Sequence, residues 1–141
     1  MSTEANPHDV LGYLLKHANL KLTALTDAAL QPFGIDSKDF GMLRVLAHRE
    51  PASQLQVAQT LGIDRTTMVA LLDALERKGI VRRRPDPGDR RKNVVELTEP
   101  GLAAYDSAEA AYREAETAFL AGISPSASSQ LRRTLRALVE G

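Results

Sequence analysis

The feature that most constrains this chain is a strongly basic segment near its middle, residues 77–92. Its sixteen positions hold eight of the 18 Lys and Arg residues and only two acidic residues, which gives it a formal charge of +6. Because the whole chain has a formal charge of zero, the remaining residues together carry −6. Positive charge concentrated in one short stretch is typical of a surface that contacts phosphate.

The residues in and after this segment predict a β-hairpin. Residues 79–84 run from Gly-Ile-Val into three arginines, and residues 93–98 return with two adjacent valines that favour a strand. Between the two runs, residues 85–89 read Pro-Asp-Pro-Gly-Asp, which is the composition of a turn. The hairpin is therefore predicted to have a long loop with bases on both sides of its turn.

Directly before the hairpin, residues 53–78 predict two helices joined by a short turn. Gly62 permits the tight turn, and Asp64 is placed to cap the second helix. This is the order of a helix-turn-helix motif. The apolar residues expected to face the core are Leu55, Ala58, Leu61, Met68, Leu71, Leu72 and Leu75.

Apolar residues at steps of three and four, separated by caps and helix breakers, predict four further helices. They are expected at residues 8–31, from Asp36 or Ser37 to residues 48–51, from Thr98 to residue 121, and after the break at residues 122–125. The Leu and Ala faces of the terminal helices could pack within one chain. They are more apolar than one thin lobe can bury, which favours a dimer.

The predicted fold is therefore mainly α, with a winged helix-turn-helix lobe and a helical dimerisation lobe. The winged lobe is expected at residues 36–98 and includes the small β-hairpin, and the dimerisation lobe is expected at residues 8–34 and 99–141. At 141 residues the chain is long enough to form a core of its own, so residues 1–141 are interpreted as a single domain.

Composition excludes several classes of protein. The chain has no cysteine, which excludes disulfides, thiolate metal sites and thiol-based redox sensing. It has no apolar run long enough to span a bilayer, and its first seven residues lack the features of a signal peptide, so a cytoplasmic location is expected. The three histidines, at 8, 17 and 48, are not spaced with acids as metal ligands. No catalytic set or glycine-rich phosphate loop stands out, so we predict neither an enzyme nor a cofactor.

Residues 61–79, 81–91 and 97–101 together resemble the MarR (multiple antibiotic resistance regulator) family, and the similarity in size and helix order extends over nearly the whole chain. The most specific part is the Asp-Arg-Arg of residues 89–91 followed by Leu-Thr-Glu-Pro-Gly at 97–101. The resemblance implies a homodimeric winged-helix regulator, expected to be a repressor, that binds a pseudo-palindromic operator in double-stranded DNA. It also implies that Arg91 enters the minor groove and that Asp89 orients it.

Ten residues are expected to contact DNA. The resemblance places the major-groove contacts near the start of the second helix of the motif, but Ala70 departs from the Arg or Lys that many members carry there. Alanine can contact a thymine methyl group but cannot donate to guanine, which shifts the expected base contacts towards Arg65 and Thr66. Arg83 is expected to be structural, with Asp73 as its partner. The predicted DNA contacts are Arg65, Thr66, Thr67, Val69, Ala70, Arg84, Asp89, Arg90, Arg91 and Lys92.

Two further expectations remain. The resemblance implies a pocket for a small aromatic acid between the two lobes, for which Tyr13, His17 and Phe40 are candidates, although plain core is the preferred interpretation of Phe40. The alternative to a DNA-binding regulator is a winged helix used for protein interaction, without specific DNA binding. That alternative would not require a basic wing.

Overall fold

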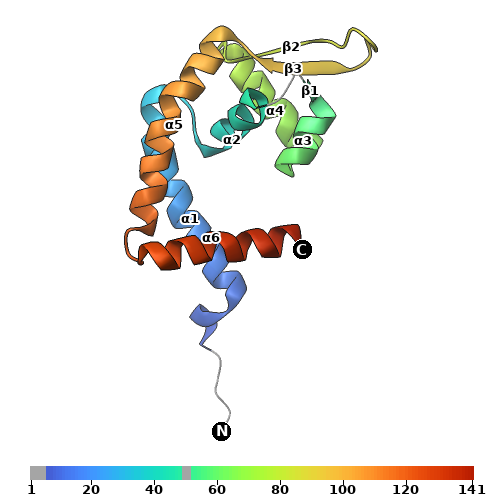
Figure 1. Ribbon diagram of the computed structural model, residues 1–141. Helices are drawn as coiled ribbons and strands as arrows, with labels where there is room; N and C mark the ends of the chain where they lie inside the picture. Colours follow the sequence, from blue (N-terminus) through green and yellow to red (C-terminus); the bar gives the residue numbers. More distant parts are fainter. Residues whose placement is uncertain (1–5, 49–51) are drawn as a thin grey trace.

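The computed structural model describes residues 6–48 and 52–141 (Figure 1). Two parts of the sequence predictions lie outside the described residues. One is the end of the second helix, expected at residues 48–51, of which 49–51 are not described. The other is the N-terminal segment that was expected not to be a signal peptide, of which residues 1–5 are not described. The elements are, in order, the 3-10 turn η1 (Pro7–Asp9), α1 (Leu11–Leu30), the 3-10 turn η2 (Gln31–Phe33), α2 (Ser37–Ala47), β1 (Ala52–Ser53), α3 (Gln54–Leu61), α4 (Arg65–Arg77), β2 (Val81–Pro85), β3 (Asn93–Leu97), α5 (Glu99–Leu120) and α6 (Pro125–Glu140).

The predicted fold class is confirmed: the chain is mainly α, with a helix-turn-helix followed by a β-hairpin wing. Figure 1 shows α5 running away from this winged lobe, with α6 turning away at its lower end and the start of α1 extending beyond α6. Along its length α5 packs against α1. No helix in the described part of the chain combines the length and apolar character needed to cross a membrane.

Side-chain caps explain where α2 to α6 begin, whereas α1 has no side-chain cap. Asp36, and not Ser37, caps α2: its carboxylate accepts the N–H of Asp39 at 2.9 Å, and the Asp39 carboxylate accepts the N–H of Asp36 at 3.0 Å. At α3, Ser53 and Gln56 form the same reciprocal pair. Each cap satisfies N–H groups that have no partner within their own helix, which fixes the helix start.

The turn between α3 and α4 requires the glycine that the sequence places there. Gly62 has φ +66°, a left-handed conformation that costs other residues energy, and its N–H donates to the carbonyls of Ala58 and Gln59. Asp64 then caps α4 and accepts the N–H of Thr67 at 2.7 Å. The turn is therefore short, and residues 65–67 in the first turn of α4 are exposed.

The hairpin pairs β2 with β3 antiparallel, with Arg82 opposite Glu96 and Arg83 opposite Val95. A third short strand, β1, pairs with the other edge of β3, so the strand order is β1-β3-β2. Sequence reasoning did not predict β1, because two residues carry no periodicity. Through β1, the start of α3 is hydrogen-bonded to the wing.

The core lies between α2, α3, α4, the sheet and the first half of α5. The predicted inward face of α3 is wrong at Leu55, which is 68% exposed, whereas Val57 is 1% exposed and takes its place. A helix of eight residues has only two turns, so apolar spacing alone could not fix which side faces inward. On α4 the predicted face is correct: Met68, Leu72 and Leu75 are buried and Leu71 is partly buried.

The N-terminus of α5 is joined tightly to the end of α4 and the start of β2. The hydroxyl of Thr98 donates to the carbonyls of Gly79 and Ile80, and also accepts the N–H of Gly101 as the cap of α5. Gly101 must be glycine here, because a Cβ at this position would overlap the carbonyl oxygen of Ile80. The Leu-Thr-Glu-Pro-Gly motif is therefore a close-packed junction between three elements.

Candidate nucleic-acid interface

The first turn of α4 presents a polar, exposed surface. Arg65, Thr66, Thr67 and Ala70 are exposed, and Val69 is partly buried. Hydrogen bonds from the amide and hydroxyl of Thr67 hold the pKa of the Asp64 carboxyl below its usual value, so the cap stays ionised at neutral pH. The structure thus brings all five predicted α4 residues to one end of the helix.

A groove with a volume of about 470 Å³ separates α3 and α4 from the wing. Arg65 lines it from α4, and Arg91 and Lys92 line it from the wing, so predicted contacts from both elements meet here. Sequence reasoning missed the other lining residues, because their place depends on how the wing folds beside α3. Those residues are Ser53, Gln54, Leu55, Ala58, Gln59, Gly62, Ile63, Met68 and Asn93.

Hydrogen bonds within the turn shape the tip of the wing. The N–H of Asp86 donates to the carbonyl of Lys92 at 2.9 Å, which closes the loop. The carboxylate of Asp89 accepts the backbone N–H of Arg91 at 3.1 Å and its Nε at 3.2 Å. The same bonds lower the pKa of Asp89 below its usual value. Asp89 therefore binds the backbone N–H and the Nε of Arg91, while the side chain of that arginine stays 92% exposed.

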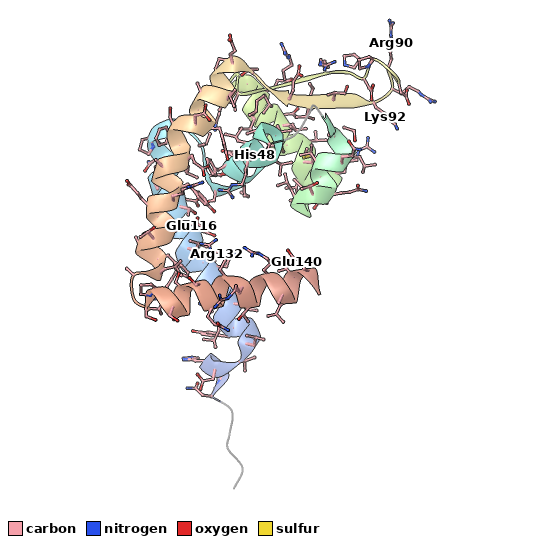
Figure 2. All side chains as sticks on the ribbon, viewed as in Figure 1. His48, Arg90, Lys92, Glu116, Arg132 and Glu140 are labelled. Atoms are coloured by element: carbon pink, nitrogen blue, oxygen red, sulfur yellow. The ribbon has the colours of Figure 1, made fainter. Side chains whose placement is uncertain are left out.

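Figure 2 shows Arg90 and Lys92 projecting from the end of the wing. Within residues 6–48 and 52–141, neither of them forms an ion pair, and the same is true of Arg65. Their charges are therefore available to an anionic partner.

The three arginines of β2 are engaged with acids of the protein. The predicted pairing of Arg83 is confirmed, because its Nη2 lies 2.5 Å from Oδ1 of Asp73. Its Nε also lies 3.2 Å from Glu76, which sequence reasoning missed. The signal was available, since Glu76 follows Asp73 by three residues and shares its helix face.

On the same strand, Arg82 and Arg84 both donate to Glu96 of β3. Burial alone would raise the pKa of Glu96, but the hydrogen bonds from these two arginines bring it below its usual value. The structure thus places Arg84 on the wing as expected, but with a protein partner. Its contact with DNA stays a prediction.

The three predicted ligand contacts do not come together. The rings of Tyr13 and His17 stack on α1 with centroids 3.9 Å apart, and His8 stacks on the other side of Tyr13 at 5.0 Å. Phe40 is fully buried in a separate group, because α2 turns it towards α5 to stack on Tyr105 and Tyr112. The expectation of one pocket formed by Tyr13, His17 and Phe40 is therefore not supported by their placement.

A different cavity of about 490 Å³ lies between α2, α5 and α6. The guanidinium of Arg44 lies over the ring of Tyr112 at 4.6 Å and over that of Phe40 at 4.8 Å, at the edge of this space. Glu116 of α5 and Arg132 of α6, both labelled in Figure 2, also line this cavity. Sequence reasoning missed this cavity because its residues come from three distant segments, namely Arg44, Glu109, Tyr112, Arg113, Glu116, Thr117, Leu120 and Arg132.

Comparison with known proteins assigns the family. Residues 33–92 match the family model described as "MarR family". The chain is 35% identical over 104 residues, or 72% of its length, to the "HTH-type transcriptional repressor NicR" of Pseudomonas putida. The match spans 66% of that relative, just under two thirds of its length.

Solved structures agree over almost the full chain. A MarR-family transcriptional regulator from Rhodococcus sp. RHA1 is 30% identical with a TM-score of 0.87, and the match covers 95% of both chains. CouR from Rhodococcus jostii RHA1, bound to p-coumaroyl-CoA, is 32% identical with a TM-score of 0.79 and 92% coverage of both chains. CouR bound to a 23-mer DNA duplex has a TM-score of 0.87. Because the chain has a winged lobe with a basic wing and is similar to these proteins over most of its length, it belongs to the MarR family of transcriptional regulators.

Proposed function

We propose that the chain forms a homodimer that binds a pseudo-palindromic operator in double-stranded DNA and represses transcription. One observation carries the proposal: the exposed start of α4 and the basic wing tip line the same groove. A helix and a cationic hairpin presented together fit the adjacent grooves and phosphates of a duplex. The DNA-bound structure of CouR and the name of the NicR relative support this function. Regulation by binding requires no catalysis, and we propose that it takes place in the cytoplasm.

Within this interface we propose two roles. Arg65 and Thr66, at the exposed start of α4, read base edges in the major groove, and Ala70 can contact a thymine methyl. Arg91 enters the minor groove from the wing tip. Arg90 and Lys92 contact phosphates and contribute affinity for any sequence.

The apolar surface of the terminal helices supports a second copy of this chain as partner. The helix α6 buries none of its residues in the single chain. Burying this surface between two chains would remove it from water, which is the main driving force for such an interface. The exposed apolar residues on α1 and α6 are Leu11, Tyr13, Leu14, Leu15, Leu20, Leu25, Leu131, Leu135, Leu138 and Val139.

We also propose that a small organic anion releases the DNA by binding in the cavity between α2, α5 and α6. The cavity is lined by the guanidinium groups of three arginines and by two carboxylates, one of which already pairs with Arg113, so its lining keeps a net positive charge that suits an anionic group. Structural similarity to CouR with p-coumaroyl-CoA supports a ligand of this kind. Tyr13 and His17 do not line this cavity and remain a separate proposed contact surface at the start of α1, whereas Phe40 borders the cavity only through Arg44. Such a ligand must bind the DNA-incompetent arrangement more tightly than the competent one.

The DNA-binding proposal is tested by selecting duplexes from a random pool at fixed salt. We expect an enriched site with dyad symmetry. Arg65→Ala or Thr66→Ala should change the preferred bases, while Arg90→Ala or Lys92→Ala should weaken all sequences equally and reduce the salt dependence. Enrichment of no duplex at all would favour a winged helix used for protein interaction.

The ligand proposal is tested by thermal shift with a panel of aromatic carboxylates, followed by competition against bound DNA. Arg132→Gln should raise the concentration of ligand needed to release DNA without changing DNA affinity in its absence. Arg136→Gln, one turn later on α6 and outside the cavity lining, is the matched control. Equal effects of the two substitutions would remove this cavity from the proposal.

A further inference from the structure

Glu96 is the shared partner of two arginines on the outer face of the wing. Its Oε1 accepts Nε of Arg82 at 2.8 Å and Nε of Arg84 at 3.0 Å. Nη2 of Arg82 also lies 2.8 Å from the same oxygen. Glu96 is 16% exposed, whereas Arg82 and Arg84 are 61% and 39% exposed. The carboxylate is thus covered by the two guanidinium groups that it holds.

The pairing of the strands explains this geometry. Arg82 lies directly opposite Glu96, and Arg84 lies opposite Val94, two residues along the same strand as Glu96. Because side chains alternate along a strand, these groups share one face, and Arg83 points to the other face and to α4. One carboxylate therefore offsets two cations, and this three-residue cluster keeps a formal charge of +1.

We propose that Glu96 is a positioning residue that holds Arg82 and Arg84 away from the DNA backbone, and so limits the affinity of the wing for DNA of arbitrary sequence. The inference rests on the proposed DNA-binding function. It goes beyond that function because it assigns a role in specificity to an acidic residue that reads no base.

The physical reason is the competition between the carboxylate and phosphate for the same guanidinium groups. A cation that neutralises a phosphate releases condensed counterions, which raises affinity for every sequence alike. A guanidinium already paired with Glu96 contributes less affinity when it contacts a phosphate, because it must first give up its hydrogen bonds to the carboxylate. Specificity is the ratio of operator affinity to random-sequence affinity. Keeping the guanidinium groups of Arg82 and Arg84 from phosphates lowers the random-sequence affinity and so increases this ratio.

The test is Glu96→Gln, which keeps the shape and an amide oxygen acceptor but removes the charge. We expect it to tighten binding to a random-sequence duplex several-fold at low salt. The slope of log K against log[salt] should steepen by about 0.9 for each additional phosphate contacted. Operator binding should gain less, so the specificity ratio should fall. Glu114→Gln on α5 makes the same change in net charge far from the wing and should leave all three quantities unchanged.

Further variants separate restraint from a merely structural role. Adding Arg84→Gln to Glu96→Gln should cancel the part of the gain in random-sequence affinity that comes from Arg84, and adding Arg82→Gln as well should cancel the rest. Arg84→Gln in the presence of Glu96 should lower that affinity less than Arg90→Gln does, because Arg84 is paired with Glu96 whereas Arg90 forms no ion pair within the described residues. This last comparison keeps the proposal testable if Glu96→Gln fails to fold.

The outcomes are distinguishable from failure of the proposed function. If the unmodified protein binds no duplex, the DNA-binding proposal fails and this one fails with it. If the unmodified protein binds its operator but Glu96→Gln leaves the salt slope unchanged or weakens both DNAs equally, the DNA-binding proposal stands and the restraint by Glu96 is refuted.

Discussion

Nη2 of Arg83 lies 2.5 Å from Oδ1 of Asp73, so the wing is fastened to the helix that precedes it in the chain. Glu76 holds the same guanidinium from the next turn of α4. Two elements that are proposed to contact different grooves are thereby kept at a fixed separation.

Arg83→Gln should lower the free energy of unfolding by about 1 kcal/mol, a modest value because the partner acids are about half exposed to solvent. Urea denaturation measures this change. Arg90→Gln on the wing tip is the control and should have no effect on stability, because Arg90 projects into solvent. Equal stability of the two variants would show that the Arg83 pairs do not stabilise the fold.

The same cluster predicts a dependence of stability on pH. Hydrogen bonds from Arg83 hold the pKa of Glu76 below its ordinary value of 4.5 in the folded state. Because the folded pKa is the lower one, the stabilisation is complete above the unfolded value and is lost as pH falls through the folded value. Glu76→Gln should therefore flatten the decline in stability below about pH 4.5. Thermal unfolding over a pH series measures this slope, and parallel curves for the two proteins would contradict the prediction.

Arg91→Ala should weaken operator binding by about 1–3 kcal/mol, the range for loss of one good groove contact. The fold should be unaffected, since the side chain is almost fully exposed. Asp89→Ala should reproduce part of the loss. It removes the carboxylate that orients Arg91 through its Nε, but it leaves the positive charge of Arg91 in place. Titration of labelled operator measures both effects, and unchanged affinity of Arg91→Ala would remove this residue from the interface.

Gly101→Ala should destabilise the protein by about 1–3 kcal/mol, because the added methyl group forces the start of α5 away from the carbonyl of Ile80. Gly122→Ala is a matched control, since a Cβ there meets nothing within 4 Å. Calorimetric unfolding of the two variants gives the comparison. A Gly101→Ala protein as stable as the control would contradict the prediction, since it would mean that α5 moves away from the carbonyl of Ile80 without a loss of stability.

Leu14→Asp or Leu135→Asp should weaken the dimer by several kcal/mol, because each places a charge in the apolar seam proposed between two chains. Binding to a two-half-site operator should weaken with dimerisation, although the wing is unchanged. Sedimentation at micromolar concentration measures the assembly. Leu55→Asp, at an exposed leucine of the winged lobe, should leave sedimentation unchanged. A stable monomer of the unmodified protein would refute the dimer.

The sequence predicted this fold well where local chemistry decides the structure. Gly62 and Asp64 fix the turn of the motif by backbone conformation and capping, and both features are visible in the residue types alone. The Arg83–Asp73 pair was also expected. The failures came where a residue's neighbours are distant in sequence. Leu55 was assigned to the core because two helical turns do not determine a face, and its exposure depends on where the wing lies.

The candidate site shows the same division. The basic wing tip was recognisable from composition, whereas the role of Glu96 depends on the hairpin register that places it opposite Arg82. Phe40 was grouped with Tyr13 and His17 through the ligand pocket that the family resemblance implies, but packing against α5 places it in another aromatic group. The charged cavity near Arg44 draws on three separate helices, so no local pattern could have revealed it.

The junction at Thr98 and Gly101 makes α5 behave mechanically as a lever. Its first turn is bonded to the carbonyls of Gly79 and Ile80, so the end of α4 and the base of the wing must follow any tilt of that helix. A helix of 22 residues is about 33 Å long. A tilt of about 5° about one end therefore displaces the other end by about 3 Å, close to the ~3.4 Å spacing of successive base pairs. A tilt of α5 by only a few degrees about its far end would thus move the end of α4 and the base of the wing by nearly one base step.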